Sequence, residues 1–284
     1  MSNAASRSDR DADASARLAG IRATSGVSLG FAATADGVTR LAHLEESGGF
    51  RAKFPQPEHG VEAVTINTGG GMLGGDTYGF KIDVGPGATA LIASQSAERI
   101  YRTLGPAATV DVSLRAAPGA TLYWTPQETI LFSGAKLSRR LDADIATDAT
   151  LLIVEAFVFG RAAMGEDINI GALSDHWRIR RCGTLVFADA VRISGDIHSA
   201  LQSRAIGAGA RASATVLYLA PDAEERRDAA RDALGEPAGR AALSAWNGML
   251  VGRFLAPDSA TLRADIICLT EHLMRRPMSR VWGV

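Results

Sequence analysis

The amino-acid sequence predicts a mainly β protein: a helicoidal, solenoid-like body of stacked strands with α-helices attached at its C-terminal end. Three observations lead to this fold class. Short segments of β-strand character fill residues 17–220, a turn-and-strand unit returns about every thirty residues, and helical spacing appears only near the C-terminal end. Because no amphipathic helix of 10–15 residues separates consecutive strands, a parallel sheet with crossover helices is disfavoured.

The strand prediction rests on patterns of period two. Residues 77–84, TYGFKIDV, alternate apolar side chains with small or charged ones, and residues 110–114 repeat the alternation. A half-buried strand has this pattern because successive side chains point to opposite faces of the sheet. Turn signals such as Gly-Pro-Gly and Ala-Pro-Gly separate the segments and set the limits of the predicted strands.

A short word of sequence recurs along the predicted β body. Pro-Gly-Ala-Thr at 86–89 returns thirty-two positions later at 118–121, and a shorter form, Asp-Ala-Thr, follows at 148–150. Ser-Ala-Thr at 213–215 is a possible fourth copy. Each word precedes an apolar, strand-like segment. A turn and strands repeated at this period predict stacked β-coils or repeated hairpins.

The pattern changes after Pro221. Residues 222–234 predict a solvated helix, residues 246–256 one more strand, and residues 257–276 a helix with a single apolar face. That face is formed by Leu262, Ile266, Leu269 and Leu273. We therefore expect a disordered lead-in over residues 1–16 and a single β-rich domain over residues 17–284, whose helical part covers about 221–284.

Composition excludes several classes of protein. The 284 residues are 46% hydrophobic and 21% charged with a formal net charge of −1, which disfavours a nucleic-acid-binding surface. No apolar run reaches the ~18–20 residues of a membrane helix, and the N-terminus lacks the apolar core of a secretory signal, so we expect a cytoplasmic protein. Cys182 and Cys268 stand outside any zinc motif and are expected to be free, buried thiols.

The most unusual stretch is the glycine loop, residues 69–76, GGGMLGGD. Gly69, Gly71 and Gly74 match the G-x-G-x-x-G dinucleotide pattern, so a nucleotide-binding enzyme is one alternative. However, a bound phosphate needs the N-terminus of a helix, and a strand-like segment follows this loop. A wide turn that needs positive φ is favoured instead, and its structural residues would be Gly70, Gly71, Gly74 and Gly75.

Several carboxylates stand beside glycines or inside apolar segments. Asp76, Glu128 and Glu166 are each open to a structural or a functional interpretation. Glu155 lies within the apolar segment LLIVEAFVFGR, where an ionised carboxylate needs a partner to offset its desolvation. Arg161 is close in the sequence, so the sequence predicts an ion pair between Arg161 and Glu155.

The sequence lacks the marks of an enzyme. Its five histidines are scattered, and none belongs to an H-E-x-x-H or similar metal-binding pair. The sequence also offers no convincing set of a nucleophile and a base. We therefore expect no preformed catalytic site and no tightly bound cofactor.

Several uncommon words occur together in a fixed order. Residues 69–102 contain the GG-x-x-GGD loop, a PGA turn and a Q-x-x-x-x-x-YR word, residues 122–140 contain PQETI-x-F, and residues 155–166 contain GR-x-x-x-GE. In order and spacing these words resemble the urease accessory protein D family, called H in some organisms. The closing RRPMSRVW, residues 275–282, is similar to the end of family members.

The resemblance implies a urease maturation factor without enzymatic activity and with a β-rich, helicoidal body. Its implied partners are the helical adaptor F, the GTPase G and the apo-urease subunits, with no nucleic acid and no membrane. The resemblance also implies that nickel passes through the protein, with Asp76, Glu128 and Glu166 as transient contacts. Carboxylates and water hold Ni²⁺ weakly, whereas a cluster of His and Cys would retain it. A β-solenoid binding module unrelated to urease remains an alternative.

Overall fold

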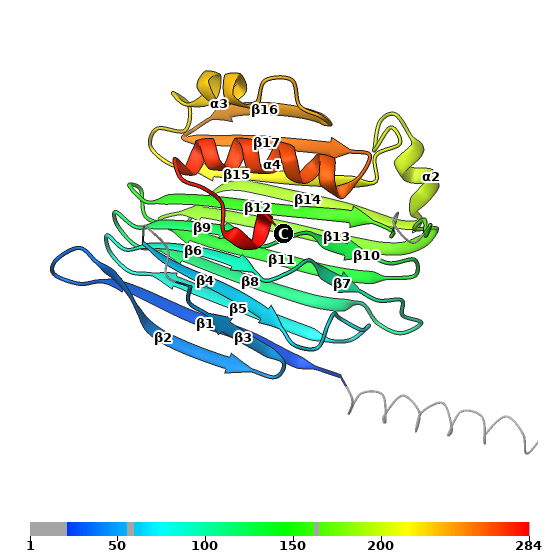
Figure 1. Ribbon diagram of the computed structural model, residues 1–284, viewed down its shortest axis with the longest axis horizontal. Helices are drawn as coiled ribbons and strands as arrows, with labels where there is room; N and C mark the ends of the chain where they lie inside the picture. Colours follow the sequence, from blue (N-terminus) through cyan, green and yellow to red (C-terminus); the bar gives the residue numbers. More distant parts are fainter. Residues whose placement is uncertain (1–21, 56–59, 162–164, 284) are drawn as a thin grey trace, which may run out of the picture.

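The structure is a computed structural model that describes residues 22–55, 60–161 and 165–283. Two β-sheets are stacked face to face, and the helices lie at the periphery of this sandwich (Figure 1). The mainly β, solenoid-like class predicted from the sequence is therefore confirmed. The predicted lead-in over residues 1–16 falls outside the described residues.

The smaller sheet contains seven strands. They are β1 (Thr24–Ala33), β2 (Thr39–Ser47), β5 (Thr77–Val84), β8 (Ala108–Ala116), β11 (Lys136–Ile145), β13 (Ile170–Arg181) and β14 (Thr184–Asp196). Their order across the sheet is β14-β13-β11-β8-β5-β1-β2.

The larger sheet contains ten strands. They are β3 (Phe50–Lys53), β4 (Val61–Asn67), β6 (Thr89–Ser94), β7 (Glu98–Ile100), β9 (Thr121–Thr125), β10 (Thr129–Leu131), β12 (Thr150–Phe159), β15 (Ala212–Leu219), β16 (Arg240–Trp246) and β17 (Met249–Ala256). The main order is β16-β17-β15-β12-β9-β6-β4-β3, while β10 pairs with β12 and β7 beside this path. The described helices are α2 (Ile197–Gln202), α3 (Arg227–Leu234), α4 (Ser259–Met274) and the 3₁₀-helix η2 (Arg280–Gly283).

The chain winds from one sheet to the other, so that each coil adds a parallel strand to both. Thr89 on β6 lies beside Thr121 on β9, and Thr121 lies beside Thr150 on β12. The repeated word therefore marks the same point of three successive coils, as the repeat predicts. The possible fourth copy does not continue this stack, because β15 runs antiparallel to β12 and places Thr215 opposite Glu155.

Strand β12 shows why part of the sequence is continuously apolar. Leu151 and Ile153 face the core between the two sheets, whereas Leu152 and Val154 belong to a second core on the outer face of the larger sheet. Helix α4 covers that outer face and buries all four residues of its predicted apolar side. A strand that is covered on both faces needs apolar residues at both phases of its alternation.

Two details of the C-terminal part differ from simple expectation. Besides helices, residues 221–284 contribute β16 and β17 to the larger sheet. Cys182 and Cys268 are free, as expected, but both are exposed rather than buried, because one follows the end of β13 and the other lies on an outward side of α4. None of the described helices combines the length and apolar character that crossing a membrane would need.

Candidate functional site

The glycine loop is a wide turn that packs against the next coil. Gly71 has φ of 143° and Gly70 has φ of 73°. A Cβ atom added to Gly71 would lie 2.4 Å from a ring carbon of Tyr101, and the Tyr101 hydroxyl donates a hydrogen bond of 2.9 Å to the Gly70 carbonyl. Strand β5 begins at Thr77, directly after the loop, so no helix N-terminus is available there for a phosphate.

The other two glycines of the loop meet different demands. Gly75 has φ of 88° and is followed by Asp76, the last residue before β5. Gly74 has no positive φ, but a Cβ atom there would lie 2.0 Å from the Thr103 hydroxyl oxygen. Close approach, rather than backbone conformation, therefore requires glycine at this position.

Asp76 fastens the glycine loop to the start of the first strand. Its side chain is buried, with one oxygen accepting a hydrogen bond of 2.9 Å from the Ala23 N–H. The other oxygen accepts one of 2.7 Å from the Leu73 N–H. Two backbone donors thus satisfy this carboxylate in the described structure.

Glu166 is the partner of Arg161. The two side chains form an ion pair, and Glu166 also accepts a hydrogen bond of 3.2 Å from the Ser133 N–H. The Arg161 guanidinium lies 4.3 Å from the centre of the Phe132 ring. The predicted pair between Arg161 and Glu155 is therefore wrong. Six residues of extended chain separate these two positions by roughly 20 Å, so neighbours in the sequence are not neighbours in space.

Glu155 instead belongs to a buried ion cluster that joins the two sheets. Arg139 on β11 forms an ion pair with Glu155 on β12 and a second one with Asp175 on β13. The Arg139 Nε and Nη2 atoms donate hydrogen bonds of 2.9 and 3.0 Å to the two Asp175 oxygens. All three side chains are at most 5% exposed.

Indole donors hold the two carboxylates of this cluster. Trp124 Nε1 donates to Glu155 at 2.8 Å, and Trp177 Nε1 donates to Asp175 at 3.0 Å. Burial raises the pKa of the Glu155 carboxyl, and Arg139 opposes this shift. Burial alone would lower the pKa of Arg139, yet Asp175 and Glu155 together raise it above its ordinary value. The guanidinium is therefore held firmly in its charged form.

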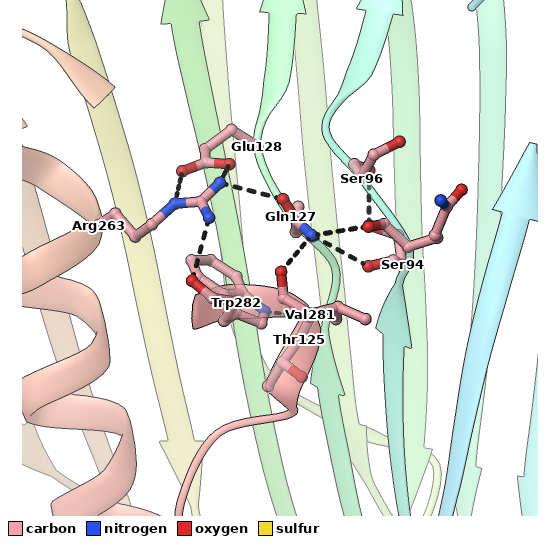
Figure 2. A network of polar contacts seen from close by, with 9 residues as sticks. Ser94, Ser96, Thr125, Gln127, Glu128, Arg263, Val281 and Trp282 are labelled. Carbon is pink, nitrogen blue, oxygen red and sulfur yellow. Dashed lines mark hydrogen bonds and ion pairs between the residues drawn. The ribbon is translucent and has the colours of Figure 1, made fainter. Parts of the chain in front are cut away.

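Glu128 lies in a different network, on the outer side of the larger sheet (Figure 2). Arg263 on α4 donates two hydrogen bonds to its carboxylate, of 2.9 and 2.7 Å, and a further one of 3.0 Å to the side-chain amide oxygen of Gln127. Arg263 also donates to the Trp282 carbonyl at 3.0 Å, while the Gln127 amide donates to the Val281 carbonyl at 2.7 Å. This network ties the C-terminal turn to the sheet.

A cavity of about 100 Å³ lies between the two sheets. Its lining includes the exposed Gly70 and Ser96 and the buried Trp124 and Glu155, so it leads from the glycine loop into the interior. Two short connections border this cavity, one between β6 and β7 and the other between β9 and β10. The first contributes Ser96 to the lining, and the second contributes Gln127.

A polar group built around Glu98 lines this cavity, together with Asn67 and Tyr78. The Asn67 amide donates to both Glu98 oxygens, at 3.0 and 3.1 Å, and also to the Tyr78 hydroxyl at 3.1 Å. Burial raises the pKa of the Glu98 carboxyl, and the donors from Asn67 and the Arg99 N–H oppose that shift. Burial likewise raises the pKa of Tyr78 to about 12.

A second cavity, of about 300 Å³, begins on the other side of Glu155. Its lining includes Asp175, Trp177, Phe157 and Arg253. Glu155 lines both cavities, so the buried ion cluster stands between them. Within the described ranges, no group of three or more His, Cys, Asp or Glu side chains is arranged to hold a metal ion.

The three carboxylates predicted as nickel contacts line neither cavity. Asp76 ends the glycine loop, whose Gly70 and Gly71 line the first cavity, Glu166 pairs with Arg161, and the side chain of Glu128 faces α4. Sequence reasoning missed Arg139 and Asp175, although a signal was present. Both stand at the buried phase of an alternating strand, Arg139 between Leu137 and Leu141 and Asp175 between Leu173 and Trp177.

Comparison with known proteins identifies the family of this chain. The sequence profile of the family described as UreD urease accessory protein matches residues 23–283. The chain is 43% identical to the urease accessory protein UreD of Azorhizobium caulinodans, covering 93% of this chain and 97% of the relative. The UreD proteins of Xanthobacter autotrophicus and a Methylobacterium species are 46% and 45% identical, covering 87% and 90% of this chain and 86% and 93% of the relatives. The chain belongs to the UreD urease accessory protein family.

Proposed function

We propose that the chain is a maturation scaffold for urease that lets nickel pass through its interior. Family membership over residues 23–283 carries this proposal, since the relatives are named urease accessory proteins. In this role the chain binds the helical adaptor F, the GTPase G and the apo-urease subunits. It works as a binding protein and carries out no chemical step of its own.

The two cavities support the route that the ion would take. The first has Glu98 near its entrance and Glu155 at its inner end, and the second continues from Glu155 along Asp175. Carboxylates spaced along a passage offer Ni²⁺ oxygen ligands one after another, without the His and Cys ligands that would bind it tightly. Nickel is thus cargo rather than a resident cofactor.

Asp76, Glu128 and Glu166 stay in the proposal as transient contacts at the surface of this route. Asp76 ends the glycine loop, whose Gly70 and Gly71 line the first cavity, and Glu128 follows Gln127, which also lines it. Glu166 accepts a hydrogen bond from Ser133, in the loop after β10. Each already has a partner, so nickel would have to compete with backbone N–H groups or an arginine. Weak, reversible contact is what a passage requires.

Co-expression with the urease operon tests the proposal. A tagged chain should recover the helical adaptor and the urease subunits from the lysate. Glu166→Gln should leave this recovery unchanged and lower the nickel content of the purified urease. Recovery of neither partner would refute the scaffold role, whereas full nickel content with Glu166→Gln would remove only Glu166 from the route.

A further inference from the structure

The buried ion cluster forms the wall between the two cavities. Arg139 lines the first cavity, Asp175 lines the second, and Glu155 lines both. Any ion that moves from one cavity to the other must therefore pass these side chains. The cluster holds one guanidinium and two carboxylates, all in an environment from which water is largely excluded.

The guanidinium fills the space that the two carboxylates share. It meets both Asp175 oxygens through Nε and Nη2 and turns Nη1 to Glu155. Its central carbon also lies 4.7 Å from the centre of the Phe157 ring, whose face favours a cation. The indole N–H groups of Trp124 and Trp177 occupy further acceptor positions of the same carboxylates.

Two acidic side chains from different sheets, aimed at one point, are what a divalent cation in transit would bind. We propose that Arg139 occupies the position between Glu155 and Asp175 that a divalent cation would otherwise take. The guanidinium closes the passage in the free chain, and it prevents the two carboxylates from retaining nickel. This inference rests on the proposed passage. It adds that the passage has a closed state and that nickel transfer requires the guanidinium to move aside.

The charge balance explains both effects. With Arg139 in place, the guanidinium occupies the shared site, lowers the net charge of the cluster from about −2 to about −1, and itself repels a second cation at short range. Without Arg139, two facing carboxylates have no counter-charge, and a divalent cation is the species that best compensates them. A passage made of carboxylates alone would trap the ion that it should release.

Nickel retention by the purified full-length chain tests this inference. The chain is incubated with Ni²⁺, desalted and analysed for bound metal, with folding checked by circular dichroism. Arg139→Met should retain roughly tenfold more nickel per chain than the wild type, because its carboxylates are no longer compensated. Arg139→Lys keeps the positive charge and should retain as little as the wild type.

Three further variants keep the test decisive. Arg139→Met combined with Asp175→Asn preserves the net charge of the cluster, so it should fold even if the single variant does not, and it should also retain nickel through Glu155. Adding Glu155→Gln should abolish that gain. Arg180→Met removes the arginine of a half-exposed pair with Asp142 and should gain no nickel.

The inference is overturned if neither folded Arg139→Met variant retains more nickel than the wild type, or if the gain survives Glu155→Gln. Co-purification of the wild-type chain with the adaptor and urease is measured alongside. Failure of that co-purification would count against the proposed function but would leave the nickel comparison among the variants intact.

Discussion

Gly71 shows how much a single position constrains the glycine loop. Its φ of 143° lies in a region that side chains rarely adopt, and Tyr101 and the Arg99 carbonyl oxygen leave no room for a Cβ atom. The letters of the loop fit a dinucleotide motif, but the reason for glycine here is contact between successive coils. The loop therefore supports the entrance of the first cavity rather than a phosphate.

Replacing Gly71 with alanine should lower the free energy of unfolding by roughly 2–5 kcal/mol, through backbone strain and overlap with Tyr101. Urea unfolding measures this loss. The matched control is Gly79→Ala on β5, where an added Cβ would meet no atom within 4 Å and φ is not positive. That change should stay within about 0.5 kcal/mol. Equal stability of the two variants would show that the loop is not held by this contact.

At the scale of elements, the sequence predicts the coils better than it predicts the contacts between them. The repeated Pro-Gly-Ala-Thr word gives the stacking of β6 on β9, because period and turn are local properties of the chain. The copy at 213–215 misleads, since nothing local distinguishes an antiparallel β15 from another parallel strand. The apolar face of α4 is likewise readable from its spacing alone.

The candidate site is harder to predict from the sequence, because its residues come from strands that are far apart along the chain. Glu155 is recognisable as a buried carboxylate that needs a partner. That partner, Arg139, lies sixteen positions away on the opposite sheet, and Asp175 comes from yet another strand. Only the winding of the chain brings the three together, so proximity in the sequence selects Arg161 wrongly. The alternation of β11 identifies Arg139 as buried but does not identify what it meets.

The C-terminal turn η2 is an element whose docking can be tested. Trp282 is 1% exposed, and its Nε1 atom donates a hydrogen bond of 2.9 Å to the Thr125 carbonyl at the end of β9. Trp282→Ala should destabilise the chain by about 3–5 kcal/mol because it empties a buried aromatic site. The measurement is the urea midpoint of the full chain.

Trp282→Phe serves as the control for this prediction. It keeps most of the buried ring but loses the indole donor, so the expected loss is only about 1–3 kcal/mol for the unpaired carbonyl. An unchanged midpoint for Trp282→Ala would mean that the turn does not pack against the sheet. A loss as large for phenylalanine as for alanine would assign the stabilisation to the hydrogen bond rather than to packing.

At the scale of the whole molecule, winding the chain between two sheets leaves two cavities that meet at the Arg139 cluster. Successive coils are stacked in register, so the connections that follow β6 and β9 lie next to each other. Residues of both connections line the first cavity. The second cavity continues beyond the Arg139 cluster. Blocking the first cavity therefore tests the proposed passage separately from the scaffold role.

Ala97 lies between β6 and β7 and lines the first cavity, whose volume is about 100 Å³. A benzene ring fits an engineered cavity of about 150 Å³, so the ring of Ala97→Phe should fill most of this smaller space. The matched control, Ala97→Ser, leaves the cavity open. The direct measurement is the nickel content of urease purified from cells that carry each variant, with recovery of the adaptor and urease checked in the same preparation. The account predicts intact recovery for both variants and urease nickel well below the wild-type level for Ala97→Phe only. Wild-type nickel content with a folded, assembled Ala97→Phe chain would contradict it.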